Sequence, residues 1–176
     1  TKHEVDLMTD FDRAIPFMPE HIWIYHSITP VIAATMILLV KTKRIFFTTF
    51  WSCIVATVIL NSMYLLFPSF YPRGDGANNT FPSGHVTFAW ILFCGVFCSV
   101  AAKKLKGIKS LYLLWAVGIS MSTLVLKQHY IVDVFSGFGL ATTIFFLVKT
   151  LFEGKGLYQD NEKMLDEANY LCPDKE

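Results

Sequence analysis

Five long apolar segments constrain the fold of this chain more than any other feature. They run approximately over residues 21–40, 45–67, 84–102, 108–126 and 130–152. Each is near the length of about 20 residues that an α-helix needs to cross the apolar core of a bilayer. They are too long for strands and show no sustained alternation. Because backbone polar groups in lipid must be satisfied within each segment, the sequence predicts an all-α, polytopic membrane bundle of about five transmembrane helices.

The composition excludes several classes of function. The chain is 53% hydrophobic and 16% charged, whereas soluble domains contain roughly 25% charged residues. Its net charge of +1 and the lack of a basic stripe argue against a nucleic-acid partner. The four cysteines have no metal-site spacing and are interpreted as apolar packing residues. We therefore expect the bilayer as a partner and neither a metal nor a cofactor; the sequence does not indicate an oligomeric state.

The chain divides into three parts by its polarity. Residues 1–20 are too polar to span a membrane and are interpreted as an interfacial amphipathic helix, with a disordered leader as the alternative. Residues 21–152 form the predicted transmembrane catalytic domain, and residues 153–176 form a polar cytoplasmic tail. The apolar residues that recur at roughly helical spacing in the first part are Leu7, Met8, Phe11, Ala14, Ile15 and Met18.

The basic residues between the apolar segments predict the topology. Lysines and arginines gather after the first segment, between the third and fourth, and at the end of the fifth. In an alternating layout these three clusters share one side, which the positive-inside rule assigns to the cytoplasm. His85 begins the third segment and His129 precedes the fifth, so we expect both histidines on the outer face. That face would be periplasmic in a bacterial inner membrane, or lumenal in a eukaryotic one.

His129 and Asp133 are the first candidate catalytic pair. Their spacing of four residues predicts that one helical turn brings both side chains to the same face. A carboxylate that accepts a hydrogen bond from one imidazole nitrogen fixes the tautomer and leaves the other nitrogen as a nucleophile or base. An unpaired carboxylate inside a span is costly, which makes Asp133 a functional candidate. The alternative is a structural pair that caps a helix.

Ser83, Gly84 and His85 form the second candidate cluster. They follow Pro82, and proline fits the first turn of a helix, where no backbone donor is needed. The free N–H groups of a helix start favour a phosphate. The Ser83 hydroxyl and the Gly84 N–H are therefore candidate phosphate ligands, and His85 is a candidate general acid. A serine helix cap beside an interfacial histidine is the alternative.

Two cations are candidates for the positive charge that phosphoryl transfer requires. Arg73 lies in the predicted outer loop and Lys127 lies two residues before His129. Either side chain can bind a phosphate oxygen. The alternative for both is an interfacial side chain that extends toward the headgroups.

Pro82-Ser83-Gly84-His85 and His129-xxx-Asp133 resemble the second and third signature motifs of the type 2 phosphatidic acid phosphatase superfamily, over about residues 45–152. The resemblance implies a membrane hydrolase that needs no metal. His129 would form a phosphohistidine, Asp133 would orient it, and His85 would protonate the leaving alcohol. Ser83 and Gly84 would bind phosphate oxygens.

The sequence departs from the pattern of that family in two places. Leu66 stands where the first motif has a lysine, and Thr123 stands where the third motif has an arginine. The family core has six spans, so the interfacial segment replaces the first span or an upstream span is missing from this chain. These departures leave the substrate class open. We expect a phosphatase acting on a lipid phosphate or diphosphate; the alternatives are a head-group phosphotransferase similar to inositol phosphorylceramide and sphingomyelin synthases, and a non-catalytic lipid-binding protein.

Overall fold

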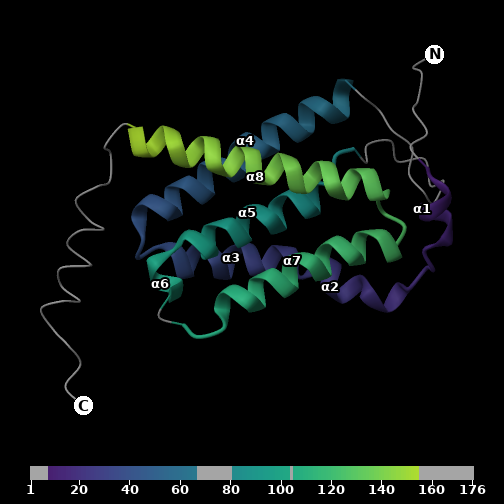
Figure 1. Cartoon of the computed structure of the whole chain (residues 1–176), viewed down its shortest axis with the longest axis horizontal. Coiled ribbons are helices and arrows are strands. Elements are labelled where there is room, and N and C mark those ends of the chain that lie inside the picture. The colour runs from purple at the N-terminus through teal and green to yellow at the C-terminus, as the bar shows by residue number, and fades with distance from the viewer. Residues whose placement is uncertain (1–7, 67–80, 104, 155–176) are drawn as a thin grey trace, which may run out of the picture.

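The computed structural model describes residues 8–66, 81–103 and 105–154 of the chain. All regular elements within these residues are helical, and they pack as a bundle with roughly parallel axes (Figure 1). In chain order they are α1 (Asp10–Ala14), the 3₁₀ turn η1 (Pro19–His21), α2 (Ile22–His26), α3 (Ile28–Leu39), α4 (Lys43–Leu66), α5 (Gly84–Cys98), α6 (Val100–Lys103), α7 (Ile108–Val125) and α8 (Ile131–Gly154).

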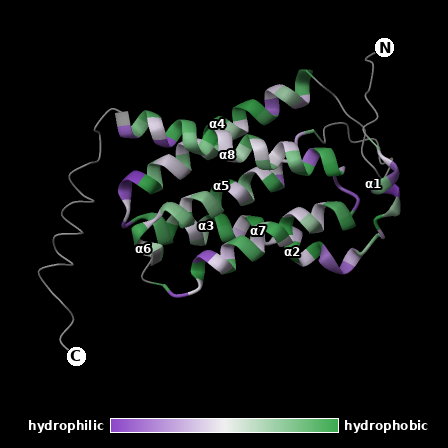
Figure 2. Ribbon diagram, in the orientation of Figure 1, coloured by the Kyte–Doolittle hydropathy of each residue, from purple (hydrophilic) through white to green (hydrophobic). Residues whose placement is uncertain are grey.

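The helices confirm an integral, multi-pass membrane protein. Within the described residues, four helical stretches are long and apolar enough to cross a bilayer, and α5 is a fifth, shorter apolar helix. Figure 2 shows hydrophobic residues along the helices and hydrophilic residues mainly toward the two ends of the bundle. The four long stretches are Pro19–Leu39, Lys43–Leu66, Ile108–Val125 and Ile131–Glu153.

Helix α5 is the centre of the bundle and contacts α3, α4, α7 and α8. Its 15 residues span about 22 Å, less than the apolar thickness of a bilayer, which is compatible with a helix surrounded by protein. The sequence predicted one segment through residue 102, but α5 ends at Cys98 and Ser99 is extended. The buried Ser99 hydroxyl lies 3.3 Å from the Thr42 hydroxyl at the α3–α4 turn, and this contact fixes the chain where the helix is interrupted.

Polar side chains link neighbouring helices inside the bundle. The Thr35 and Tyr112 hydroxyls lie 2.8 Å apart between α3 and α7. The Trp115 indole N–H donates to the Ser27 hydroxyl at 2.8 Å, and the Trp90 indole N–H donates to the Ser120 hydroxyl at 3.2 Å. Interhelical hydrogen bonds of this kind contribute about 0.6 kcal/mol each on average in membranes. They fix how α3, α5 and α7 are rotated against one another.

The two candidate motifs lie at the same end of the bundle. Figure 1 shows the start of α5, the end of α7, the start of α8 and α1 together at one end, with α6 and the α3–α4 connection at the other. At that other end Arg44 and Glu153 form an ion pair. The predicted co-location of the two motifs is therefore present in the structure.

The N-terminal segment differs from the expected amphipathic helix. Among its described residues the α-helix is confined to Asp10–Ala14, and the residue that α1 buries is Asp12. Phe11, expected on the apolar face, is 78% exposed. The cause is a polar attachment to the bundle: the Met18 N–H donates to the Val125 carbonyl at 2.9 Å, and the Ile131 N–H donates to Asp12 at 2.8 Å.

Candidate active site

A tight turn between α7 and α8 presents His129. The Gln128 and His129 N–H groups both donate to the Thr123 carbonyl, at 2.9 and 3.2 Å. Lys127 has φ 53°, a left-handed conformation that costs a non-glycine residue roughly 1–2 kcal/mol. The chain can therefore reverse within a few residues, and His129 lies just before α8 begins.

His129 and Asp133 are paired, as their spacing predicted. His129 Nδ1 lies 3.3 Å from Asp133 Oδ2. The same oxygen accepts the Tyr130 N–H at 2.9 Å, so Asp133 also caps the start of α8. Because α8 begins at Ile131, the pair bridges the turn and the helix instead of lying along one helical face. With Nδ1 toward the carboxylate, Nε2 is the nitrogen available for chemistry.

The side chains of His129 and Asp133 are both buried, which is unusual for ionisable groups. Asp133 is fully buried and His129 is 8% exposed. Within the described residues, Asp133 Oδ1 is buried without a hydrogen-bond partner. A buried carboxylate with incomplete hydrogen bonding is costly. Positive charge on the adjacent imidazole would lower that cost.

The start of α5 is joined directly to the start of α8. The Ser83 N–H donates to the Asp133 carbonyl at 3.1 Å. The fully buried Ser83 hydroxyl is the N-cap of α5 and accepts the Val86 N–H at 3.5 Å. A Cβ placed on Gly137 would lie only 2.8 Å from the Ser83 carbonyl oxygen. Glycine at this position is therefore what allows the two helices to approach.

His85 lies in the first turn of α5 and is held by an aromatic ring. Its imidazole stacks on Tyr25 of α2, with centroids 3.9 Å apart and planes at 22°. It lies close enough to His129 for their charges to interact. It also lines a cavity of about 360 Å³ whose other walls are mostly apolar. These walls come from Ile28, Ile32, Thr57, Leu60, Asn61, Tyr64, Gly84 and Phe88.

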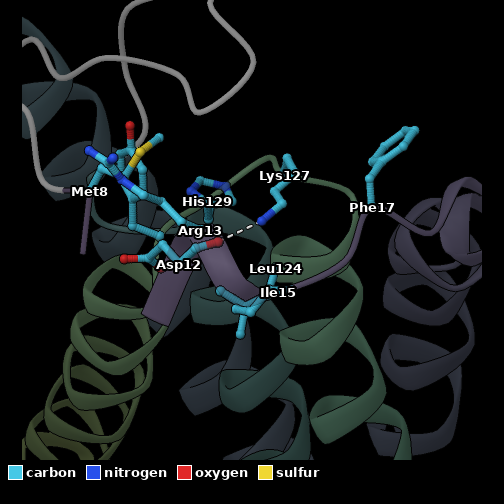
Figure 3. A pocket seen from close by; sticks show the side chains of 9 residues that line it. Met8, Asp12, Arg13, Ile15, Phe17, Leu124, Lys127 and His129 are labelled. Atoms are coloured by element: carbon cyan, nitrogen blue, oxygen red, sulfur yellow. Dashed lines mark hydrogen bonds between the residues drawn. The ribbon is translucent and has the colours of Figure 1, made fainter. Parts of the chain in front are cut away.

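Lys127 and His129 line a second cavity, of about 300 Å³ (Figure 3). The Lys127 ammonium donates to the backbone carbonyl of Asp12 at 2.5 Å, drawn as the dashed line in Figure 3. Arg13 of α1 lines the same cavity. The N-terminal segment is thus one wall of the cavity that contains His129.

Asp12 attaches that wall to the bundle. Its Oδ1 accepts the Ile131 N–H, and its Oδ2 accepts the Thr9 N–H at 2.9 Å and the Thr9 hydroxyl at 2.5 Å. Burial alone would raise the pKa of Asp12, but the hydrogen bonds from Thr9 and Ile131 and the charge of Lys127 outweigh it and hold the pKa below its ordinary value. The carboxylate is therefore ionised at neutral pH and faces the positive end of α8.

Sequence reasoning missed Asp12 and Tyr25. Thr9 and Asp12 form a capping box, and their spacing was a visible signal for a helix start but not for docking. Tyr25 lies within the first apolar segment, where no local pattern signals a contact with His85. Arg73 lies outside the described residues. Among the described residues, no group of three or more histidine, cysteine or carboxylate side chains is placed to hold a metal ion.

Comparison with known proteins gives one family. The family model described as PAP2 superfamily matches residues 63–156, more than half of the chain. This range contains His85, His129 and Asp133. No curated protein matches the chain, and no solved structure matches it.

Proposed function

The chain belongs to the PAP2 superfamily, and from this membership and the site geometry we propose that it is an integral membrane phosphatase that hydrolyses a lipid phosphate or lipid diphosphate. Its membrane-spanning helices fit a membrane phosphatase. The observation that carries the proposal is the contact between His129 and the buried Asp133, with Nε2 on the side away from the carboxylate. The site would face the periplasm or a lumen, opposite the basic connections.

In the first proposed step, His129 Nε2 attacks phosphorus and the bond between phosphorus and the lipid oxygen breaks. His85 donates a proton to that oxygen, and the lipid leaves as an alcohol or, from a diphosphate, as a monophosphate. The product on the enzyme is a phosphohistidine whose ring carries positive charge. Asp133 stabilises this charge by accepting the Nδ1 hydrogen bond.

In the second proposed step, water attacks the phosphohistidine and His85 accepts its proton. The N–P bond breaks, inorganic phosphate leaves, and His129 returns to its starting state. In this proposal Ser83 and Gly84 bind phosphate oxygens, and Ser83 also has a structural role. Ser83 caps α5 and its N–H donates to the Asp133 carbonyl, and the N–H groups at a helix start favour phosphate oxygens.

The surroundings of the two histidines support a lipid substrate. The mainly apolar cavity beside His85 suits the leaving group, because His85 protonates the lipid oxygen. The cavity beside His129 contains Lys127 and suits the phosphoryl group. The substrate phosphorus would then lie between the cavities, with its lipid part toward α3, α4 and α5.

A phosphate-release screen on the purified chain tests the proposal. The panel comprises phosphatidic acid, phosphatidylglycerol phosphate, isoprenyl diphosphates and lipid A, without added alcohol. We expect release by the wild type and none by His129→Ala, with both proteins equally folded by circular dichroism. Full activity in His129→Ala would disprove the nucleophile assignment. Strict dependence on an added alcohol would replace the phosphatase by a phosphotransferase with the same intermediate.

Trapping the intermediate tests the mechanism separately. Brief incubation with ³²P-labelled substrate should label the wild type through a bond that is labile in acid and stable in base, as expected for phosphohistidine. His85→Ala should retain some labelling when the substrate has a leaving group that needs no proton, such as p-nitrophenyl phosphate. Acid-stable label, or label that persists in His129→Ala, would contradict the mechanism.

A further inference from the structure

Arg13 lies in the wall of the cavity that contains His129. Arg13, Lys127 and His129 come from α1, from the α7–α8 turn and from the residues before α8, and they surround one cavity of about 300 Å³ (Figure 3). Two fixed cations beside a histidine make the cavity suited to an anion. A guanidinium presents a planar fork of donors that matches phosphate oxygens.

The guanidinium of Arg13 is available for such a ligand. The residue is exposed, and no described residue forms an ion pair with its side chain. The acidic neighbour Asp12 does not neutralise it, because both carboxylate oxygens are engaged by Ile131 and Thr9. Within the part of the chain that the structure describes, the position of Arg13 therefore does not depend on a salt bridge that a ligand would have to break.

The backbone that carries Arg13 is held at three points. Asp12 accepts the Ile131 N–H at the start of α8, Lys127 donates to the Asp12 carbonyl, and the Met18 N–H donates to the Val125 carbonyl. These contacts attach α1 and the residues that follow it to the end of α7, the turn that presents His129 and the start of α8. An arginine on a segment fixed in this way loses less freedom on binding than one on a loose terminus.

We propose that Arg13 is a phosphate-binding residue of this site, which the N-terminal segment adds to the cavity next to Lys127 and His129. It binds the non-bridging oxygens of the phosphoryl group that His129 attacks. The inference rests on the proposed function for its substrate, but the binding of a phosphate-like anion can be measured without turnover.

The kinetic experiment compares Arg13→Gln, Arg13→Lys and Lys41→Gln in the full chain. Lys41 is exposed and lies between α3 and α4 at the opposite end of the bundle, so Lys41→Gln controls for loss of one positive charge. Loss of a charge-assisted contact should lower kcat/KM of Arg13→Gln about 10- to 100-fold. It should raise the inhibition constant of inorganic phosphate by a similar factor. Arg13→Lys should recover part of both effects, and Lys41→Gln should match the wild type.

The outcomes separate this inference from the proposed function. In one outcome the wild type turns over lipid phosphate, and Arg13→Gln keeps its kcat/KM and its inhibition constant for inorganic phosphate within twofold of the wild type. That result would overturn the role of Arg13 and leave the proposed function standing. If the wild type turns over no lipid phosphate, the proposed function fails, and calorimetric titration with orthovanadate decides the inference. Binding by the wild type that weakens in Arg13→Gln but not in Lys41→Gln supports it, whereas equal binding or no binding overturns it. A thermal unfolding midpoint within about 2 °C of the wild type shows that the variants are folded.

Discussion

The contact between α5 and α8 at Gly137 offers a test of the site geometry that changes no proposed catalytic group. A methyl group on Gly137 would lie 2.8 Å from the Ser83 carbonyl oxygen, 3.2 Å from Thr87 Oγ1 and 3.3 Å from Val86 Cβ. Ordinary contacts begin at 3.4 Å. The nearest atom belongs to backbone and cannot rotate away, so Gly137→Ala must separate the two helix starts.

The expected loss of stability follows from two opposing effects. Overpacking of this kind costs about 1–3 kcal/mol, and replacing a helical glycine by alanine returns about 1 kcal/mol. The net loss is then about 0–2 kcal/mol, which corresponds to a fall of up to roughly 8 °C in the unfolding midpoint for a chain of this size. Gly139→Ala is the matched control, because a Cβ there meets nothing within 4 Å. We expect Gly139→Ala to be as stable as the wild type or more so.

We expect Gly137→Ala to lose catalytic activity even at temperatures where the variant is fully folded. The Ser83 N–H donates to the Asp133 carbonyl, so separating the helices also moves His85 relative to His129. Misplacement of reacting groups by about 1 Å costs on the order of 100-fold in rate, and we expect a loss of about tenfold or more in kcat for the smaller shift here. Thermal unfolding in detergent and phosphate release, measured on both alanine variants, provide the assay. Equal stability and equal kcat for the two variants would refute the close approach.

Three further perturbations test the surroundings of the site. Lys127→Gly should unfold at a higher temperature than Lys127→Ala, since both lose the ammonium but only glycine adopts φ 53° without strain; equal midpoints would contradict the left-handed turn. Asp12→Asn should lower the midpoint at pH 7 by weakening the contact with Ile131. The pKa of Asp12 in the folded protein is below its ordinary value of 3.8. The stabilisation by the carboxylate is therefore fully present above pH 3.8 and disappears as the pH falls through the folded pKa, so the unfolding midpoints of the wild type and Asp12→Asn should converge in acid. A difference between these midpoints that stays constant with pH would argue against this role of Asp12. Tyr25→Leu should remove the stacking on His85 and slow release from a lipid phosphate at least tenfold, with a smaller effect on p-nitrophenyl phosphate; equal effects on both substrates would separate Tyr25 from proton donation.

The parts of the fold that follow from the sequence are those governed by local pattern. Apolar length predicted the spans, and counting the crossings placed His85 and His129 at one end. The spacing of four residues predicted the contact between His129 and Asp133. These inferences need no knowledge of how the helices pack, because each depends on a single segment or on the order of segments.

The parts that could not be predicted depend on contacts between distant segments. The hydrogen bond between Asp12 and the Ile131 N–H joins residues 119 positions apart. The spacing of Thr9 and Asp12 indicates a helix start, but nothing in the local pattern shows that Asp12, and not the exposed Asp10, contacts α8. The stacking of Tyr25 on His85 likewise requires α2 to lie against the start of α5. The helix break at Ser99 was missed because the apolar pattern continues through it, whereas the contact between Ser99 and Thr42 that accompanies the break joins distant parts of the sequence.

The candidate site therefore combines residues from two parts of the chain, one inside the range that matches the family and one before it. His85, His129 and Asp133 lie within the range that matches the PAP2 superfamily, residues 63–156. Tyr25 and Asp12 lie before that range, yet one stacks on His85 and the other holds the wall of the cavity next to His129. In the proposed reaction the matched helices would supply the chemistry, and the preceding segment would shape the space around the phosphoryl group. Substitutions before residue 63 should then change the choice of substrate more than the nature of the reaction.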